Sequence, residues 1–258
     1  MIKKILFAAA SCALFFSTAN AQKYISLGPV ISFGHSGLTN GKYFDGVNDA
    51  QLKSKFHPSF TAGISAIYAK NPHWGFGGEL LYEQLGFTKN IVIKPTSVIE
   101  PWLVTPLDYD QTKDVSYIRI PLRVYYFFGQ YKQKVRPKVY AGPSFGFKLA
   151  ENNKLEGNDD YTKTWISSAG EKSFPNPEFN TFDLGLQVGV GANITLGKAV
   201  WLNADINYYQ GFLDAMTNTD IHFTNQNGTE VILQNGTNWN QNLRLQVGVL
   251  FGLGRLKK

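Results

Sequence analysis

The chain has 258 residues, a formal net charge of +6 and a single cysteine, Cys12. One cysteine excludes an intrachain disulfide and any metal site built from several thiolates. The basic residues are scattered along the chain and form no run, which argues against a nucleic-acid-binding protein. Beyond the N-terminus, no apolar stretch reaches the roughly 20 residues that a membrane-spanning helix needs, so the sequence also excludes a helical membrane protein.

The first 21 residues are predicted to be a signal peptide. Lys3 and Lys4 give a positive start, an apolar stretch follows, and Ala-Asn-Ala at residues 19–21 matches the small-x-small pattern that a signal peptidase cleaves. Cleavage there would leave residues 22–258 as one domain. A lipoprotein signal with lipidation at Cys12 is the alternative, and it is disfavoured because three large apolar residues follow this cysteine.

Eight later segments show an alternating pattern, in which every second residue is apolar and the residues between are small or polar. Side chains alternate across a strand, so this pattern predicts strands with one apolar face. In the fourth segment, for example, Ile118 and Ile120 share one face, and Tyr117 and Arg119 share the other. The eight segments are residues 24–34, 59–69, 74–87, 116–129, 137–150, 181–196, 200–209 and 241–254.

Long and short connections alternate between these segments. The long connections are residues 35–58, 88–115, 151–180 and 210–240, and the short ones are residues 70–73, 130–136 and 197–199. Outer-membrane barrels have short periplasmic turns, longer external loops and an even number of strands. We therefore predict an all-β fold, an eight-stranded antiparallel transmembrane up-and-down β-barrel with four long external loops in the bacterial outer membrane. Both chain ends are then expected on the periplasmic side.

The last predicted loop contains a hairpin pattern. Asn227-Gly228 stands between the short β-like runs 221–223 and 231–233, and Asn-Gly in that setting predicts a two-stranded hairpin. We expect it to extend the seventh and eighth strands above the membrane.

A soluble β-sandwich, lipocalin-like barrel or jelly roll would also alternate, but its apolar face would form the interior. The apolar faces here run for five to eight residues, and the opposite faces carry many glycines and polar residues. A transmembrane barrel, with lipid outside and a polar interior, fits this pattern better than the soluble folds do.

Nine charged residues lie on the faces predicted to point into the barrel. They are Glu79, Glu83, Arg119, Arg123, Lys138, Lys148, Asp183, Asp205 and Arg244. An eight-stranded barrel is just wide enough for side chains to fill it, so we expect these residues to form a structural plug of ion pairs. One antiparallel register places Glu79 opposite Arg123 and Glu83 opposite Arg119. A narrow ion or proton path is the alternative, and balanced, mutually paired charges oppose it.

A catalytic site is not expected. His35 and Ser36, with Asp45 or Asp49, could imitate the His, Ser and carboxylate set that some small barrels use to modify lipids at the rim. A triad is recognised by its geometry in space and not by sequence position, so no residue is assigned a catalytic role. The sequence has no phosphate-binding glycine loop and no metal-ligand spacing, so no cofactor and no metal are expected.

Two strand motifs resemble a known family. Residues 117–128 (YIRIPLRVYYFF) resemble the Y-x-x-I-P-L strand of the PorT-like outer-membrane β-barrel family, and residues 140–147 (YAGPSFGF) resemble its following Y-x-G-P/A strand. Residues 183–191 and 242–254 look like its last strands. Arg119 departs from the family, which often has an acidic residue there, and the chain end lacks the terminal aromatic of many barrels.

The resemblance implies a fold and an outer-membrane location. Only some relatives take part in a protein secretion system or in gliding, so that role does not transfer with the fold. We expect a monomer in contact with outer-membrane lipids, with a plugged lumen and a structural or interaction role. This role is either an external-loop binding surface for protein partners or an accessory of a protein secretion complex. The alternatives are a narrow pore for small solutes and a rim-located lipid-modifying enzyme. No nucleic-acid partner is expected.

Overall fold

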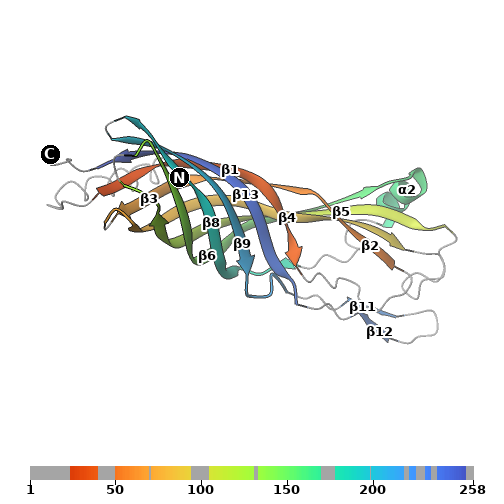
Figure 1. The fold of residues 1–258 in the computed structure, drawn as a ribbon. Coiled ribbons are helices and arrows are strands. Elements are labelled where there is room, and N and C mark those ends of the chain that lie inside the picture. The colour runs from red at the N-terminus through yellow and green to blue at the C-terminus, as the bar shows by residue number, and fades with distance from the viewer. Residues whose placement is uncertain are drawn as a thin grey trace, which may run out of the picture.

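Eight strands close into a barrel in the computed structural model (Figure 1). The strands of the ring are β1 (Tyr24–Thr39), β3 (His57–Ala69), β4 (Trp74–Ile93), β5 (Leu107–Phe127), β6 (Val135–Gly157), β8 (Phe182–Gly197), β9 (Val200–Gly211) and β13 (Trp239–Gly252). Each is antiparallel to the next along the chain, and β1 pairs with β13 to complete the ring. The predicted eight-stranded up-and-down barrel is confirmed.

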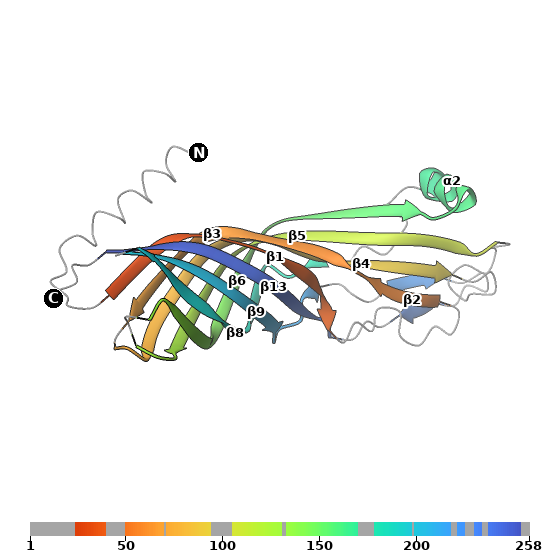
Figure 2. The same cartoon turned by 45° about the horizontal axis from the view of Figure 1, so that its top comes forward.

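The structure describes residues 24–39, 50–69, 71–93, 105–130, 133–169, 178–197, 199–217, 221–224, 230–233 and 237–253. The predicted signal peptide lies outside the described residues. Ser26 of β1 lies opposite Gly252 of β13, so the first described strand begins and the last one ends at the same end of the barrel. The described strand ends that flank the three short connections lie at that end too, as expected for the periplasmic side (Figure 2).

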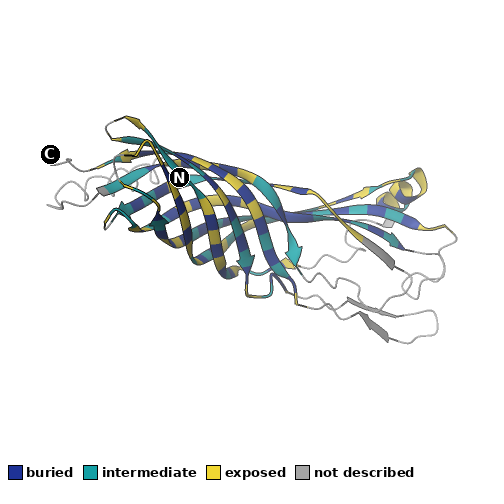
Figure 3. Cartoon of the chain, viewed as in Figure 1, coloured by how far each residue is buried: buried dark blue, intermediate teal, exposed yellow. Residues whose placement is uncertain are grey.

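The wall of the barrel is apolar outside and polar inside. Large apolar side chains such as Leu245, Phe33 and Val190 point outward and are 63%, 60% and 54% exposed, whereas Arg119 on the inside is fully buried. Figure 3 shows the resulting alternation of exposed and buried residues along each strand. A soluble barrel or sandwich would have its apolar side chains inside. The observed wall therefore fits the predicted transmembrane barrel, whose apolar face contacts lipid.

Glycines make room for large rings inside the barrel. A Cβ atom added to Gly189 on β8 would lie 2.3 Å from Cζ of Tyr140, and one added to Gly185 would lie 2.7 Å from the Tyr209 ring. Both glycines therefore allow a tyrosine of the neighbouring strand to lie flat against the wall. This packing accounts for part of the glycine content of the inward faces.

Three strands continue far beyond the bounds that the sequence pattern predicted. We expected a loop over residues 88–115, but β4 continues to Ile93 and β5 begins at Leu107. Likewise, β6 was expected to end at residue 150 and continues to Gly157. A further strand, β2 (Ala50–Lys55), pairs with the end of β4. We call β2 together with residues 88–93, 107–115 and 149–157 the external extension, which projects beyond the ring in Figures 1 and 2.

A β-bulge marks the start of this extension on β6. Tyr117 of β5 lies opposite Lys148, but Ser116 lies opposite Ala150, so Leu149 is an extra residue in the ladder. An extra residue exchanges the two faces of a strand. Even-numbered residues of β6 such as Lys138 therefore point into the barrel, whereas odd-numbered residues such as Glu151 take the inner face of the extension.

The tip of the extension carries a helix that we did not predict. Helix α2 (Asp160–Ala169) lies in the expected loop 151–180. Asp159 caps it, because its Oδ1 accepts the backbone N–H of Thr162 at 2.7 Å. In the described part of the chain, no helix combines the length and apolar character needed to cross a membrane.

Two short strand pairs complete the external side. The predicted hairpin is confirmed as β11 (Ile221–Thr224) paired with β12 (Glu230–Leu233), with its Asn-Gly turn outside the described residues. The expectation that it extends the seventh and eighth strands is wrong, because β11 and β12 form a separate sheet. Beyond the end of β9, the chain instead forms β10 (Met216–Thr217), which pairs with β7 (Glu178–Phe179).

Candidate functional site

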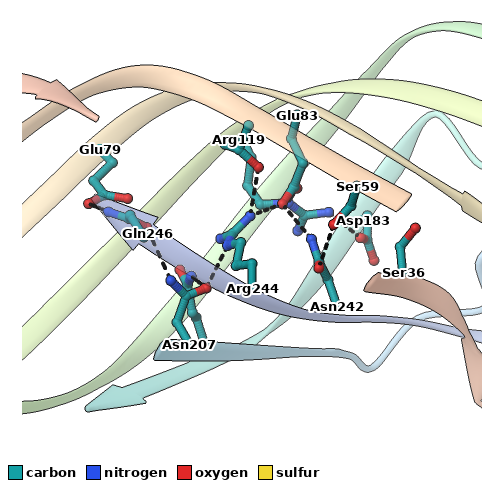
Figure 4. Close-up of polar contacts among 12 residues, drawn as sticks. Ser36, Ser59, Glu79, Glu83, Arg119, Asp183, Asn207, Asn242, Arg244 and Gln246 are labelled. Carbon is teal, nitrogen blue, oxygen red and sulfur yellow. Dashed lines mark hydrogen bonds and ion pairs between the residues drawn. The ribbon is translucent and has the colours of Figure 1, made fainter. Parts of the chain in front are cut away.

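The interior of the barrel contains an ion network built from four strands. Glu83 of β4 accepts hydrogen bonds from both Arg119 of β5 and Arg244 of β13, and Arg119 Nη2 donates to Asp183 Oδ2 of β8 at 2.8 Å. Asn242 Nδ2 also donates to Glu83, at 3.3 Å (Figure 4). We call Glu83, Arg119, Asp183 and Arg244 the ion network. Its two positive and two negative charges balance, and all four side chains are buried.

The predicted register between β4 and β5 is wrong by two residues. Arg119 lies opposite Leu81, and Arg123 lies opposite Gly77, instead of opposite the two glutamates. The expected ion pairs still form along the diagonal, because residues offset by two remain within reach of long side chains. The register follows the whole ladder, in which Trp74 lies opposite Tyr126 at the short-turn end.

A closed ring of hydrogen bonds spans the lumen next to this network. Arg123 donates to Glu79 at 2.6 Å and to Gln187 at 3.0 Å, and Gln187 donates to Asn207 at 3.0 Å. Asn207 then donates to Gln246 at 3.1 Å, and Gln246 returns to Glu79 at 2.9 Å. Five strands of the barrel each contribute one residue. We call these five residues the hydrogen-bonded ring, and it links strands on different sides of the barrel through its interior.

The amides of this ring were not among the predicted site residues. Gln187, Asn207 and Gln246 lie on the polar faces of their strands, and that face was the only sequence feature that could have identified them. Arg244 Nε joins the ring to the ion network through Asn207 Oδ1 at 2.5 Å. The amides therefore give the buried charged residues hydrogen-bond donors and acceptors that these residues do not provide for one another.

The remaining buried pair lies toward the short-turn end. Lys138 Nζ is 3.0 Å from Asp205 Oδ2 and 5.5 Å from the centre of the Tyr125 ring. Beyond this pair, apolar and aromatic side chains cluster toward the short-turn end. We call them the base cluster: Ile67, Tyr125, Phe127, Tyr140 and Leu250.

Apolar side chains also cluster toward the external end. This cap cluster contains wall residues and residues from β7, from β10 and from just before β10. Its members are Leu85, Phe87, Val115, Tyr117, Phe179, Ala215 and Met216. In the described interior, the paired charges and amides thus lie between two clusters of apolar side chains, one toward each end of the barrel.

Lys148 departs from the other predicted interior charges. Eight of the nine lie buried inside the barrel, but Lys148 is partly exposed at the external rim. Its Nζ donates to Glu151 Oε2 at 2.9 Å and to the Phe179 carbonyl at 2.5 Å. Lys113 Nζ lies 3.5 Å from the same carboxylate. The bulge at Leu149 explains the difference, because Lys148 is the last inward residue before the two faces exchange.

The rim cluster around Glu151 predicts a pH dependence. Burial raises the pKa of the Glu151 carboxyl, but hydrogen bonds from Lys148 and the Phe179 N–H, with the charge of Lys113, hold this pKa below its usual value. A carboxyl with a lowered pKa stabilises the fold above its unfolded-state pKa, and this contribution is lost as the pH falls through the folded-state pKa. We expect Glu151→Gln to destabilise the barrel at neutral pH.

The measurement is the difference in unfolding free energy between wild type and Glu151→Gln at two pH values. We expect this difference to shrink as the pH falls through the lowered folded-state pKa of Glu151, because the wild-type carboxyl then becomes protonated as well. An equal difference at neutral and acid pH would contradict the role of the carboxylate charge.

The His35 and Ser36 pair does not form the site that their sequence proximity suggested. They lie on opposite faces of β1: Ser36 Oγ donates to the Gly86 carbonyl at 3.1 Å inside, and His35 stacks on Phe56 at 4.9 Å outside. Asp45 and Asp49 lie outside the described residues.

A different histidine, His57, contacts both a hydroxyl and a carboxylate at the external rim. Its Nδ1 is 3.1 Å from Thr88 Oγ1, and its Nε2 is 3.2 Å from Asp114 Oδ1. The ring is buried and joins the first residue of β3 to β4 and β5. Among the described residues, no group of three or more His, Cys, Asp or Glu side chains is placed to bind a metal.

Comparison with known proteins gives a family match and several structural similarities. A family model described as outer membrane protein beta-barrel domain matches residues 18–217. The outer membrane protein OprG from Pseudomonas aeruginosa is 11% identical, with a TM-score of 0.48, covering 90% of this chain and 96% of that one. Neisserial surface protein A is 12% identical, with a TM-score of 0.39 and coverages of 89% and 97%.

Outer membrane protein W of E. coli is 15% identical, with a TM-score of 0.32 and coverages of 88% and 98%. No curated protein matches the chain. The family match includes seven of the eight strands of the ring, from β1 to β9.

Proposed function

The chain belongs to the outer membrane protein beta-barrel domain family, and on that premise we propose that it is a sealed barrel that acts through its external side. Its location is the bacterial outer membrane. Within the family we propose a PorT-like member, on the strength of the motif at residues 117–128, which forms the wall of β5 and carries Arg119 and Arg123. The proposed role is a binding surface or an accessory of a protein secretion complex.

The observation that carries this proposal is the external extension. A transmembrane strand needs about 9–11 residues, but β5 has 21 and β6 has 23. At about 3.3 Å per residue, β6 is roughly 75 Å long, which is much longer than crossing the membrane requires, and its last nine residues, 149–157, belong to the extension. The extension continues the hydrogen-bonded ladder of the wall, and α2 lies at its tip. A rigid element of this length is suited to hold a partner away from the membrane surface.

The sealed interior supports the same proposal over the pore alternative. A pore requires a continuous water path past Arg119 and Arg123. Arg119 is bonded to Glu83 and Asp183 and stacks at 4.0 Å on the Tyr209 ring, and Arg123 belongs to the hydrogen-bonded ring. Opening a path would break several charge-assisted hydrogen bonds at once, and these are roughly twice as strong as neutral ones.

Site-specific photo-crosslinking in native outer membranes tests the proposal. A photoreactive residue would replace Asn152 or Lys154, which are exposed on the extension, and Val190 on the lipid-facing wall would provide the control. We expect one protein adduct of the same mass from both extension positions and none from Val190. Adducts with lipid alone at all three positions would contradict a role of the extension in binding a protein.

Identification of that adduct separates the two proposed roles. An adduct with a component of a secretion complex, retained when the complex is purified from the outer membrane, favours the accessory role. An adduct with a protein outside the cell, on a barrel that purifies alone, favours a binding surface that faces outward.

A further inference from the structure

Two external loops meet in the mouth of the barrel. Phe179 of β7 lies directly opposite Met216 of β10, and each strand is only two residues long. Both side chains are buried in the cap cluster, where the Phe179 ring lies 6.1 Å from that of Phe87 on the wall. We propose that residues 178–180 and 214–217 form a latch, which opens independently of the barrel wall and closes the external mouth over the ion network.

One anchor of the latch is Asp214. Its Oδ1 accepts the backbone N–H of Met216 at 3.3 Å and that of Asn238 at 3.1 Å. Asn180 Nδ2 donates to the Asp214 carbonyl at 2.7 Å, which joins the two halves of the latch. The Asp214 carboxylate therefore ties residues 214–216 to Asn238, and the Asp214 backbone carbonyl ties them to Asn180.

The second anchor is the rim cluster around Glu151. Glu151 Oε2 accepts the backbone N–H of Phe179 at 2.9 Å, and Lys148 Nζ donates to the Phe179 carbonyl at 2.5 Å. Two side chains of β6, Glu151 and Lys148, thus hold β7 to the wall by hydrogen bonds. In contrast, neighbouring strands of the wall share long ladders, such as the one that runs from Trp74 to Ile93 along β4.

This difference in attachment is the reason to expect separate opening. Segments with few backbone hydrogen bonds open locally at a lower free energy than the surrounding sheet. When the latch opens, the wall residues Leu85 and Val115 lose the cover of Phe179 and Met216. The ion network below keeps its bonds, because none of the bonds within it involves a latch residue. The latch and the network are therefore two seals in series, and the outer one opens without the inner one.

Thiol accessibility on whole cells tests the latch. Cys12, the only cysteine, lies in the predicted signal peptide, so Val115→Cys would supply the only thiol of the mature protein. Val115 is fully buried in the cap cluster, and a membrane-impermeant maleimide would reach it only through an open latch. We expect Asp214→Ala to accelerate its labelling by about tenfold, since hydrogen bonds to a charged group are lost.

Two controls make the result specific. Asp160→Ala removes a fully exposed carboxylate on α2 and is expected to leave the labelling of Val115→Cys unchanged. A reporter at Leu250→Cys in the base cluster should stay protected in the Asp214→Ala background. Heat-dependent migration in gels verifies that each variant is folded, and Glu151→Gln replaces Asp214→Ala if the latter does not fold.

Unchanged labelling of Val115→Cys in a folded Asp214→Ala or Glu151→Gln protein would overturn the proposal. Equal acceleration at Leu250→Cys would also overturn it, because the whole barrel would then be opening and not the latch alone.

Discussion

Replacement of Glu83 with alanine is expected to lower the unfolding free energy of the barrel by about 3–5 kcal/mol, the range for removal of one partner from a buried ion pair. Glu83 accepts hydrogen bonds from both Arg119 and Arg244, and all three side chains are almost completely buried. The variant would leave two guanidinium groups short of a charge partner inside a narrow lumen. Urea unfolding of the refolded protein in lipid vesicles, followed by tryptophan fluorescence, would measure the loss.

The matched control is Glu156→Ala on the external extension. Glu156 pairs with Lys154, and its side chain is 61% exposed, so its loss should cost no more than about 1 kcal/mol. If Glu83→Ala has the same urea midpoint of unfolding as the wild type, the buried charges do not stabilise the barrel as we describe.

Leu245→Arg is the second substitution with a large expected effect. Leu245 lies in the middle of the lipid-facing wall, between Phe33 of β1 and Ile206 of β9. An arginine facing lipid near the bilayer midplane costs about 2–4 kcal/mol. The same unfolding experiment in vesicles measures this cost.

Asn152→Arg provides the control, because Asn152 is exposed on the extension, outside the barrel wall. Surface substitutions of this kind usually change stability by less than about 0.5 kcal/mol. Equal, small effects of Leu245→Arg and Asn152→Arg would contradict the placement of the apolar wall in lipid.

The alternating pattern was sufficient to predict the barrel and the side chains in its interior. The side-chain period of a strand is two, so a residue such as Arg119 in a polar row had to share a face with Arg123, and Ile118 and Ile120 had to face lipid. The alternation of long and short connections then fixed the order of the strands and the end at which they begin. Both properties depend on local sequence, which is why the prediction succeeded.

Properties that depend on the closed ring could not be predicted in this way. The β4–β5 register is set by the complete ladder, so Arg119 lies opposite Leu81 and reaches Glu83 along the diagonal. Gln187 meets Arg123, and Gln246 meets Glu79, on strands that are not neighbours, and these contacts form only because eight strands close around a shared lumen. The β-bulge at Leu149 interrupts the alternating pattern in the same way as the end of a strand would, so the sequence pattern does not distinguish the two.

The strands on the external side were predicted to be shorter than they are, for a physical reason. Residues 88–93 alternate as well, with Lys89 and Ile91 buried and Thr88 and Asn90 partly exposed. The polar residues of this segment resemble a loop when composition is given more weight than periodicity. The latch depends on contacts between segments that are distant in sequence, such as Phe179 with Met216, and no local pattern predicts these.

Single-channel recording of the purified barrel in a planar lipid bilayer tests the central claim of a sealed lumen most directly. We predict no steady conductance for the wild-type protein. We also predict none for Asp214→Ala, because the ion network and the hydrogen-bonded ring stay closed when the latch opens. Stepwise, ohmic conductance by the folded wild-type barrel would contradict the account and favour a narrow pore.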